Sequence, residues 1–151
     1  MKKIMRKLML LAMIVMAVVS AKAQNKIYAK YADMKGTEYV CINKSMMEMG
    51  ASMVDGLGSI GADKFDKMLV ISASSGTAKS SVDADIKKLC NDKDYEELVN
   101  ARDDDSKVII LFNDKASPKE FVICTVEDRE SNIIVILGNF SKKDIDKMMS
   151  K

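Results

Sequence analysis

The sequence contains no histidine and no tryptophan, and it has one proline among its 151 residues. Histidine is the commonest general base of enzymes and a frequent metal ligand. Its absence therefore excludes Ser-His-Asp and Cys-His catalytic groups and every imidazole metal site. Carboxylate pairs and serine–lysine pairs need no imidazole and stay open. The composition favours a protein that is not an enzyme.

The first 23 residues have the three parts of a secretory signal. Four basic side chains lie within residues 2–7, an unbroken apolar run follows at 8–19, and Ala21-Lys22-Ala23 matches a cleavage site. The apolar run is short for a membrane span, and no cysteine follows it to carry a lipid anchor. We expect cleavage after Ala23, release into the periplasm or beyond, and no stable membrane insertion.

Removing this segment changes the sign of the net charge. The segment holds five of the 24 Lys and Arg residues and none of the 22 Asp and Glu residues, so residues 24–151 carry 19 basic and 22 acidic side chains. A slightly acidic chain lacks the positive electrostatic field that attracts nucleic acids and anionic lipids. Residues 24–151 are enough for one domain with its own core and too few for two ordinary ones.

Strands and helices are both predicted by the apolar patterns. Runs rich in β-branched and aromatic residues predict five strands, at 37–43, 65–71, 108–112, 121–126 and 133–137. Apolar residues at helical spacing predict helices at 27–34, 45–57, 82–90, 95–101 and 141–149. Ser45 with Glu48, Asp94, and Ser141 with Asp144 are the expected helix caps.

The order of these elements predicts an α+β fold in a single domain, residues 24–151. Strands joined through a helix are usually parallel with right-handed crossovers, whereas the last three strands have short loops and should form an antiparallel meander. We expect a mixed five-stranded sheet with helices mainly on one face. Val82, Ile86, Leu89 and Cys90 should pack against it, and Asp83 and Lys87 should form an exposed ion pair.

Two of the predicted strands have no polar side. Residues 108–112 and 133–137 are apolar at every position, which is typical of strands that are covered on both faces. Either helices flank both faces of the sheet, or one face is covered by another chain. The second alternative means a protein partner or a homodimer that forms through the sheet.

Three cysteines, Cys41, Cys90 and Cys124, allow one disulfide and one free thiol, or three thiols. Cysteines in strand-like or helical apolar patterns are most often small buried side chains. A bridge between Cys41 and Cys124 is the alternative, and it requires their two strands to be neighbours.

Methionines form the most distinctive stripe of the sequence. Met46, Met47, Met49 and Met53 follow Cys41, and thioether and thiolate sulfurs are ligands that suit Cu(I). Methionine also fills irregular cores well. We expect Met46, Met49 and Met53 to face the sheet as core residues, and a soft-metal site is the alternative.

Acidic residues cluster on both sides of the predicted helix at 95–101, as Asp92, Asp94, Glu96, Glu97 and Asp103–Asp105. Carboxylates at alternating positions can bind Ca²⁺, but Glu97 occupies the position where an EF-hand loop needs glycine. Asp94 is better explained as a helix cap, and Asp103–Asp105 as a solvated loop.

Two further patterns resemble functional motifs. Residues 56–61 match G-x-G-x-x-G, but a helix precedes them and a strand follows, the reverse of the dinucleotide-binding order. Two serines have a lysine next to them in the sequence, Ser45 beside Lys44 and Ser141 beside Lys142. Adjacent side chains on a helix do not face each other, so neither pair is a catalytic serine–lysine pair. We therefore assign no catalytic, cofactor-binding or metal-binding residue and expect no cofactor.

The order of several short segments resembles a family of small exported proteins of unknown function that is common in Bacteroidetes. The matching segments are Lys30–Gly36, Glu38–Ile42, Lys44–Met47, Asp94–Leu98, Glu120–Val122 and Gly138–Ser141 with Asp144 and Ile145. The resemblance covers residues 26–149. It implies a location in the cell envelope and, for some members, genes close to sigma and anti-sigma regulators. Members often carry a lipoprotein cysteine after the signal, which this chain lacks. The family has no established activity and supplies no functional residue.

These observations together predict an exported, non-catalytic binding module of the cell envelope that acts through protein interaction, within signalling or a stress response. The alternatives are a carrier of a small ligand or of Cu(I), and an enzyme of unknown type. An interaction module should expose an apolar sheet face or strand edge. A carrier should instead show an enclosed cavity or converging sulfurs.

Overall fold

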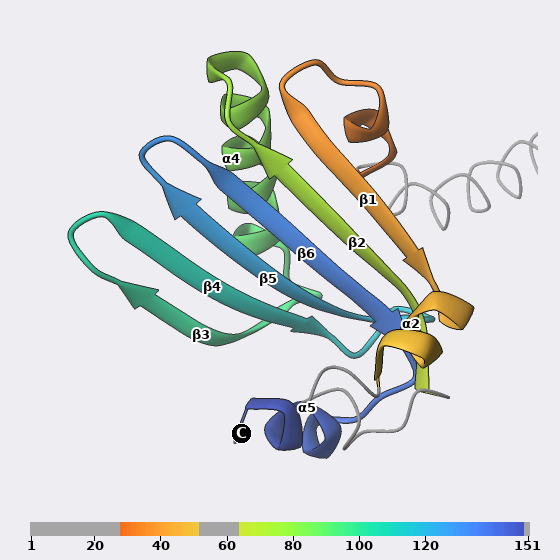
Figure 1. Cartoon of the computed structure of the whole chain (residues 1–151). Helices are drawn as coiled ribbons and strands as arrows, with labels where there is room; N and C mark the ends of the chain where they lie inside the picture. Colours follow the sequence, from red (N-terminus) through yellow and green to blue (C-terminus); the bar gives the residue numbers. More distant parts are fainter. Residues whose placement is uncertain (1–27, 52–63, 150–151) are drawn as a thin grey trace, which may run out of the picture.

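One antiparallel sheet organises the chain, as the computed structural model of residues 28–51 and 64–149 shows (Figure 1). The signal segment, Met53 and the glycine-rich residues 56–61 lie outside these described residues. The strands are β1 (Thr37–Asn43), β2 (Phe65–Ala73), β3 (Glu96–Arg102), β4 (Ser106–Asn113), β5 (Lys119–Glu127) and β6 (Ser131–Gly138). They lie in the order β1-β2-β6-β5-β4-β3, and every neighbouring pair is antiparallel.

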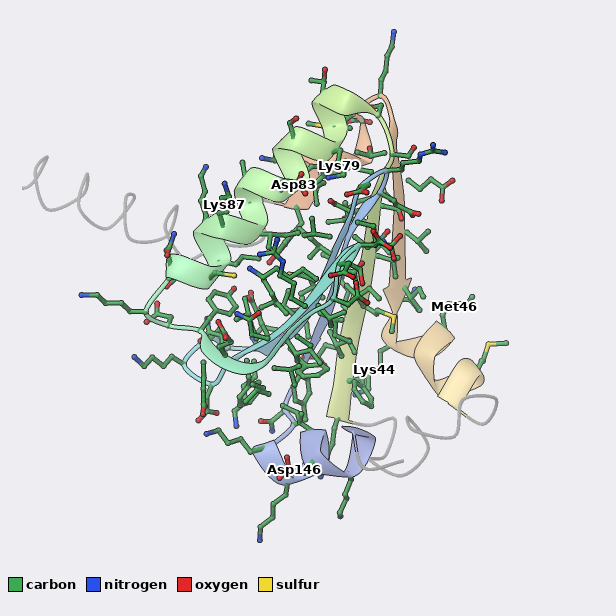
Figure 2. The ribbon with its side chains drawn as sticks, turned by 90° about the vertical axis from the view of Figure 1, so that its left-hand side faces the viewer. Lys44, Met46, Lys79, Asp83, Lys87 and Asp146 are labelled. Atoms are coloured by element: carbon green, nitrogen blue, oxygen red, sulfur yellow. The ribbon has the colours of Figure 1, made fainter. Side chains whose placement is uncertain are left out.

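The helical elements of the described residues are η1 (Lys30–Ala32), α2 (Lys44–Ala51), α4 (Gly76–Asn91) and α5 (Lys142–Met149). Figure 2 shows the sheet edge-on, with α4 along one face and α2 beside the other face near its lower end. The long helix α4 connects β2 to β3 and crosses behind the sheet in Figure 1. The α+β class and the meander β4-β5-β6 are confirmed.

The expected mixed sheet is wrong, because the described residues form six strands and no parallel neighbours. A helix between two strands leads to a parallel pair only when it crosses one face of the sheet. Helix α2 does not do so, since β1 and β2 lie side by side in antiparallel register from Thr37 opposite Ala73 to Asn43 opposite Lys67. Helix α4 does cross the sheet, but β2 and β3 are separated by three strands.

The sixth strand, β3, occupies residues that were predicted to be helical. Leu98 and Val99 lie on one side because of a β-bulge, since the register with β4 shifts between Glu97 and Val99. Tyr95 precedes the strand and packs against the core on the other face. A bulge breaks the strict alternation of a strand and puts two successive side chains on one side. Leu98 packs with the same apolar cluster as Ile110, which is the partner of Val99.

The main core lies between the sheet and α4. Val82, Ile86 and Leu89 of α4 are buried as predicted, together with Ala78. They pack on buried residues from four strands, among them Ile71, Ile109, Cys124 and Ile133. Cys90, which was expected on this side, is exposed. Lys79 pairs with Asp83 across 2.9 Å, so the Asp83–Lys87 pair was the wrong choice of partner. We call this covered side of the sheet the helix face.

Buried polar groups attach the N-terminal residues and β5 to this core. Asp85, which is 3 % exposed, accepts a hydrogen bond from the Tyr31 hydroxyl and pairs with Lys30 across 2.8 Å. Glu120 is equally buried and accepts from Tyr95, and burial raises the pKa of its carboxyl group. Each of these two carboxylates accepts a hydrogen bond from a tyrosine hydroxyl.

Candidate interaction surface

The face of the sheet opposite α4 carries a band of β-branched side chains, one from each strand. The ladder aligns Val40 with Val70, Val70 with Ile134, Ile134 with Ile123, Ile123 with Ile110, and Ile110 with Val99. Residues opposite each other in an antiparallel pair share a face, so the six side chains form one row, which we call the open band. Figure 1 looks onto this face, and no described helix crosses the row.

The side chains of the open band are accessible to solvent. Val40 is 49 % exposed, and the other five are partly exposed, whereas Ile71, Ile109 and Ile133 on the opposite side of the same strands are almost completely buried. Valine and isoleucine are among the residues most often buried in proteins. A continuous row of them that is partly exposed is therefore typical of a surface that docks another molecule.

A polar row bounds the open band toward the upper end of the strands. Ser72 donates to Glu130 at 2.8 Å and is also bonded to Asn132, which in turn donates to Thr125 at 3.0 Å. Ser72, Asn132 and Thr125 lie two residues along their strands from Val70, Ile134 and Ile123, on the same face. Their hydrogen bonds form a polar border to the apolar row.

Acidic turns continue this upper border. The turn between β3 and β4 contains Asp103–Asp105. Glu127 at the end of β5 is followed by Asp128, Arg129 and Glu130 in the turn to β6. A shallow hollow is lined by both turns, so they are neighbours. The backbone N–H groups of Asp105 and Ser106, both bonded to Asp103, lower the pKa of the Asp103 carboxyl. The upper end of the open face therefore carries negative charge.

Aromatic packing beneath α5 closes the lower end of the open face. Phe140 is 3 % exposed, and its ring centroid lies 5.9 Å from that of Phe65, 6.0 Å from Phe112 and 6.5 Å from Phe121. Ile145 of α5 joins the same cluster. Ile110, Ile123 and Ile134 of the open band pack against this cluster and keep part of their surface exposed.

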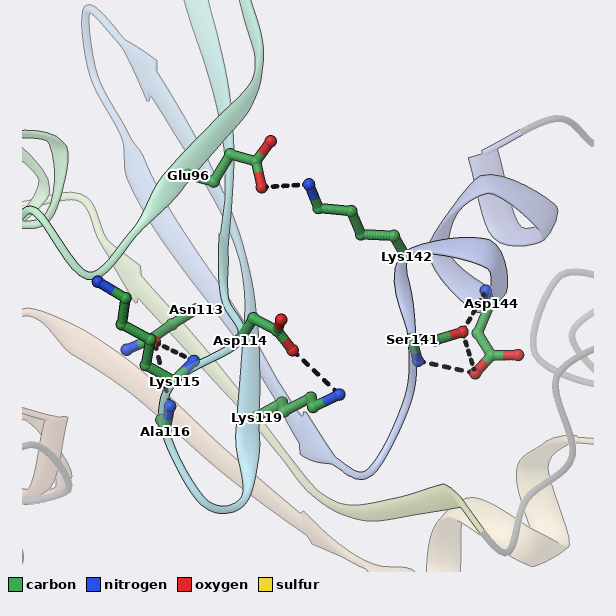
Figure 3. A network of polar contacts seen from close by, with 9 residues as sticks. All are labelled: Glu96, Asn113, Asp114, Lys115, Ala116, Lys119, Ser141, Lys142 and Asp144. Carbon is green, nitrogen blue, oxygen red and sulfur yellow. Dashed lines mark hydrogen bonds and ion pairs between the residues drawn. The ribbon is translucent and has the colours of Figure 1, made fainter.

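The N-terminus of α5 has the predicted capping pair (Figure 3). The Ser141 N–H donates to Asp144 at 2.8 Å, and the Asp144 N–H donates to the Ser141 hydroxyl at 3.3 Å. Lys64 adds an ion pair to Asp144 at 3.0 Å, and Lys142 pairs with Glu96 of β3 at 2.6 Å. These contacts fix α5 to both halves of the sheet.

Helix α2 adds exposed methionines beside the open band. Met46 and Met49 are 57 % and 72 % exposed, and Figure 2 shows Met46 on the side of the sheet opposite α4. They were predicted to face the sheet, which is wrong because α2 lies at the end of the β1–β2 pair and not across it. The cap was also misassigned, since Asn43 accepts from the Met46 N–H at 3.0 Å.

The remaining sequence candidates do not come together. Cys41 and Cys124 are free thiols on β1 and β5, which are separated by β2 and β6, so the proposed bridge is wrong. The acidic groups around Asp94 and Asp104 lie at opposite ends of β3, so they do not form one calcium site. In residues 28–51 and 64–149, no three His, Cys, Asp or Glu side chains are placed to hold a metal ion.

Comparison with known families gives a match to the model described as "Domain of unknown function (DUF4252)" over residues 28–148. The chain belongs to the DUF4252 family. No curated protein and no solved structure matches it. The family match begins at the first described residue of the N-terminal segment and ends within α5, so the DUF4252 domain includes the whole sheet and the open band.

No helix in the part of the chain that the structure describes is long and apolar enough to cross a membrane.

Proposed function

We propose that this DUF4252 protein is an exported, non-catalytic binding module of the cell envelope that docks a protein partner on the open face of its sheet. The observation that supports the proposal is the open band, which presents six aliphatic side chains in one row beside Met46 and Met49. Burial of such a row removes apolar area from water, which is the main driving force of protein association.

The negative charge at one end of the open band predicts the charge of the partner's contact surface. The two acidic turns border the band at that end, so the contact surface of the partner should be apolar in its centre and basic at one flank. Such complementarity raises the association rate and selects the orientation of the partner. The signal-like segment at residues 1–23 supports export, and the resemblance noted above supports an envelope protein of the Bacteroidetes type.

The chemistry of the described residues supports a binding role over catalysis. Ser141 is used as a helix cap, and the buried carboxylates Asp85 and Glu120 are bonded to Tyr31 and Tyr95. A nucleophile needs a base within hydrogen-bond reach, and these side chains already have structural partners.

Site-specific crosslinking tests the proposal. A photoreactive amino acid at position 134 should give protein adducts in the native envelope, and the same group at exposed Ala84 of α4 should give none. Adducts from position 134 should disappear when Ile123→Lys is added and should decrease at high salt, because both the apolar and the charged contacts are then weakened. Equal labelling from positions 134 and 84, or no adduct from 134, contradicts the proposal.

A further inference from the structure

We infer that the partner adds an extended strand to the free edge of β1, beside the open band. This inference rests on the proposed docking function and names the element that the partner contributes. Strand addition of this kind is held by main-chain hydrogen bonds, and its specificity comes from alternate side chains of the added strand.

The hydrogen bonds just before β1 show in which direction the backbone groups of this strand point. The Ser74 N–H donates to the Gly36 carbonyl at 3.3 Å, and these two residues continue the register of β1 with β2. The Thr37 N–H donates to Met34 at 3.4 Å and not to β2. Because successive residues of a strand direct their backbone groups to opposite neighbours, the even-numbered residues of β1 bond to β2 and the odd-numbered residues face away from it.

Tyr39 and Cys41 therefore direct their backbone N–H and C=O groups to the free edge. Figure 1 shows β1 as the outermost strand of the sheet, beside β2. Among the residues that the structure describes, none forms a hydrogen bond with the backbone of Tyr39 or Cys41. Each of these two residues can exchange a pair of N–H···O bonds with an added antiparallel strand.

The opposite edge of the sheet, β3, is protected against strand addition, whereas β1 is not. Strand β3 contains the bulge between Glu97 and Val99, and it has charged side chains at both ends. Bulges and charges are features by which natural edge strands prevent pairing with another chain. Strand β1 is in unbroken register with β2 over all 7 of its residues, and Glu38 is its one charged side chain. The edge of β1 is therefore the one at which another strand can pair.

The edge of β1 is accessible from both faces of the sheet and is continuous with the open band. Val40 on the open face is 49 % exposed, and Cys41 on the other face is exposed as well, because α4 packs mainly on β2 and β6. An added strand places every second side chain on the open face, next to Val40. We expect the partner to contribute an extended segment with β-branched residues at these alternate positions, so that it lengthens the open band by one strand.

Amide hydrogen exchange measured by NMR tests the edge with a defined probe, a peptide of alternating valine and threonine residues with lysines at both ends. In the free protein, the amides of Tyr39 and Cys41 should exchange about tenfold or more faster than those of Val40 and Ile42, which are bonded to β2. A saturating concentration of the peptide should slow exchange at Tyr39 and Cys41 by about tenfold or more and leave β3 unchanged. Protection of Tyr39 and Cys41 in the free protein, or no slowing with the peptide, overturns the inference.

A proline at position 41 tests the same edge in the native envelope. Cys41→Pro removes an N–H that faces away from β2, and proline is tolerated in edge strands in this orientation. It should reduce the crosslinks from position 134 by about tenfold, because the hydrogen bond to the added strand is lost. Cys41→Ser keeps the N–H and should leave the crosslinks unchanged. Val40→Pro removes an N–H bonded to β2 and should lower the melting temperature more than Cys41→Pro does.

The results separate this inference from the proposed function. Crosslinks from position 134 that a folded Cys41→Pro variant does not reduce overturn strand addition and leave the docking face intact. Peptide-dependent protection of Tyr39 and Cys41 without any crosslink from position 134 overturns the docking face and leaves the edge of β1 as a binding site. If Cys41→Pro does not fold, the exchange experiment on the wild type decides alone.

Discussion

Phe140→Ala should lower the free energy of unfolding by about 3–5 kcal/mol, the range for removing a fully buried aromatic side chain. The ring contacts three other phenylalanines, and those three come from β2, β4 and β5. Its loss leaves a cavity that the rigid strands around it cannot fill. Urea unfolding followed by circular dichroism measures the effect.

Two controls accompany this substitution. Phe140→Leu keeps most of the volume and should cost less than half as much, and Val40→Ala at a half-exposed site should cost below about 1 kcal/mol. A loss below about 1 kcal/mol for Phe140→Ala would show that the phenylalanine cluster does not hold the lower end of the open face together.

Asp144→Ala should destabilise the protein by about 1–2 kcal/mol at neutral pH, since it removes a helix cap and a partly exposed ion pair. The Ser141 N–H and then Lys64 lower the pKa of the Asp144 carboxyl to about 2. A pKa that is lower in the folded than in the unfolded state contributes stability above the unfolded value near 4, and that contribution is lost as the pH falls through about 2.

The pH series makes the test specific. The wild type and Asp144→Ala should differ most above about pH 4, and the difference should shrink as the pH approaches 2. Asp146→Ala on the same helix is the matched control and should have a small effect, because its side chain is exposed. A difference between Asp144→Ala and the wild type that does not change with pH would contradict the capping role of the carboxylate.

The elements that the sequence predicted correctly are those whose pattern is local. The meander follows from β-branched runs at 108–112, 121–126 and 133–137, which lie within β4, β5 and β6. Val82, Ile86 and Leu89 mark the inner side of α4 through helical spacing alone. The cap of α5 follows from Ser141 and Asp144, three residues apart.

The elements that it missed depend on distant residues. Strand β3 pairs with the edge of β4, and the bulge at Glu97–Val99 puts Leu98 and Val99 on one side, which interrupts the alternation expected of a strand. Met46 and Met49 are periodic in the same way as core residues, and only the place of α2 at the end of the β1–β2 pair shows that they are exposed.

The sequence indicated that one face of the sheet could be free of helices, but it did not decide this. Strands that are apolar at every position predicted either helices on both faces or a face covered by another chain. The structure places α4 on one side and leaves the row from Val40 to Val99 uncovered by any described helix. The choice depended on where α2 and α5 pack, which their own sequences do not encode.

Methyl NMR with a soluble paramagnetic probe tests most directly whether the open band is a docking surface. Ile110, Ile123 and Ile134 lie on the band, and Ile109, Ile71 and Ile133 face α4 as internal references. We predict that the probe broadens the band methyl signals in dilute solution, while the reference methyl signals are protected. Band methyl signals that are protected in dilute, monomeric protein would contradict the account, because the face would then be covered within a single chain.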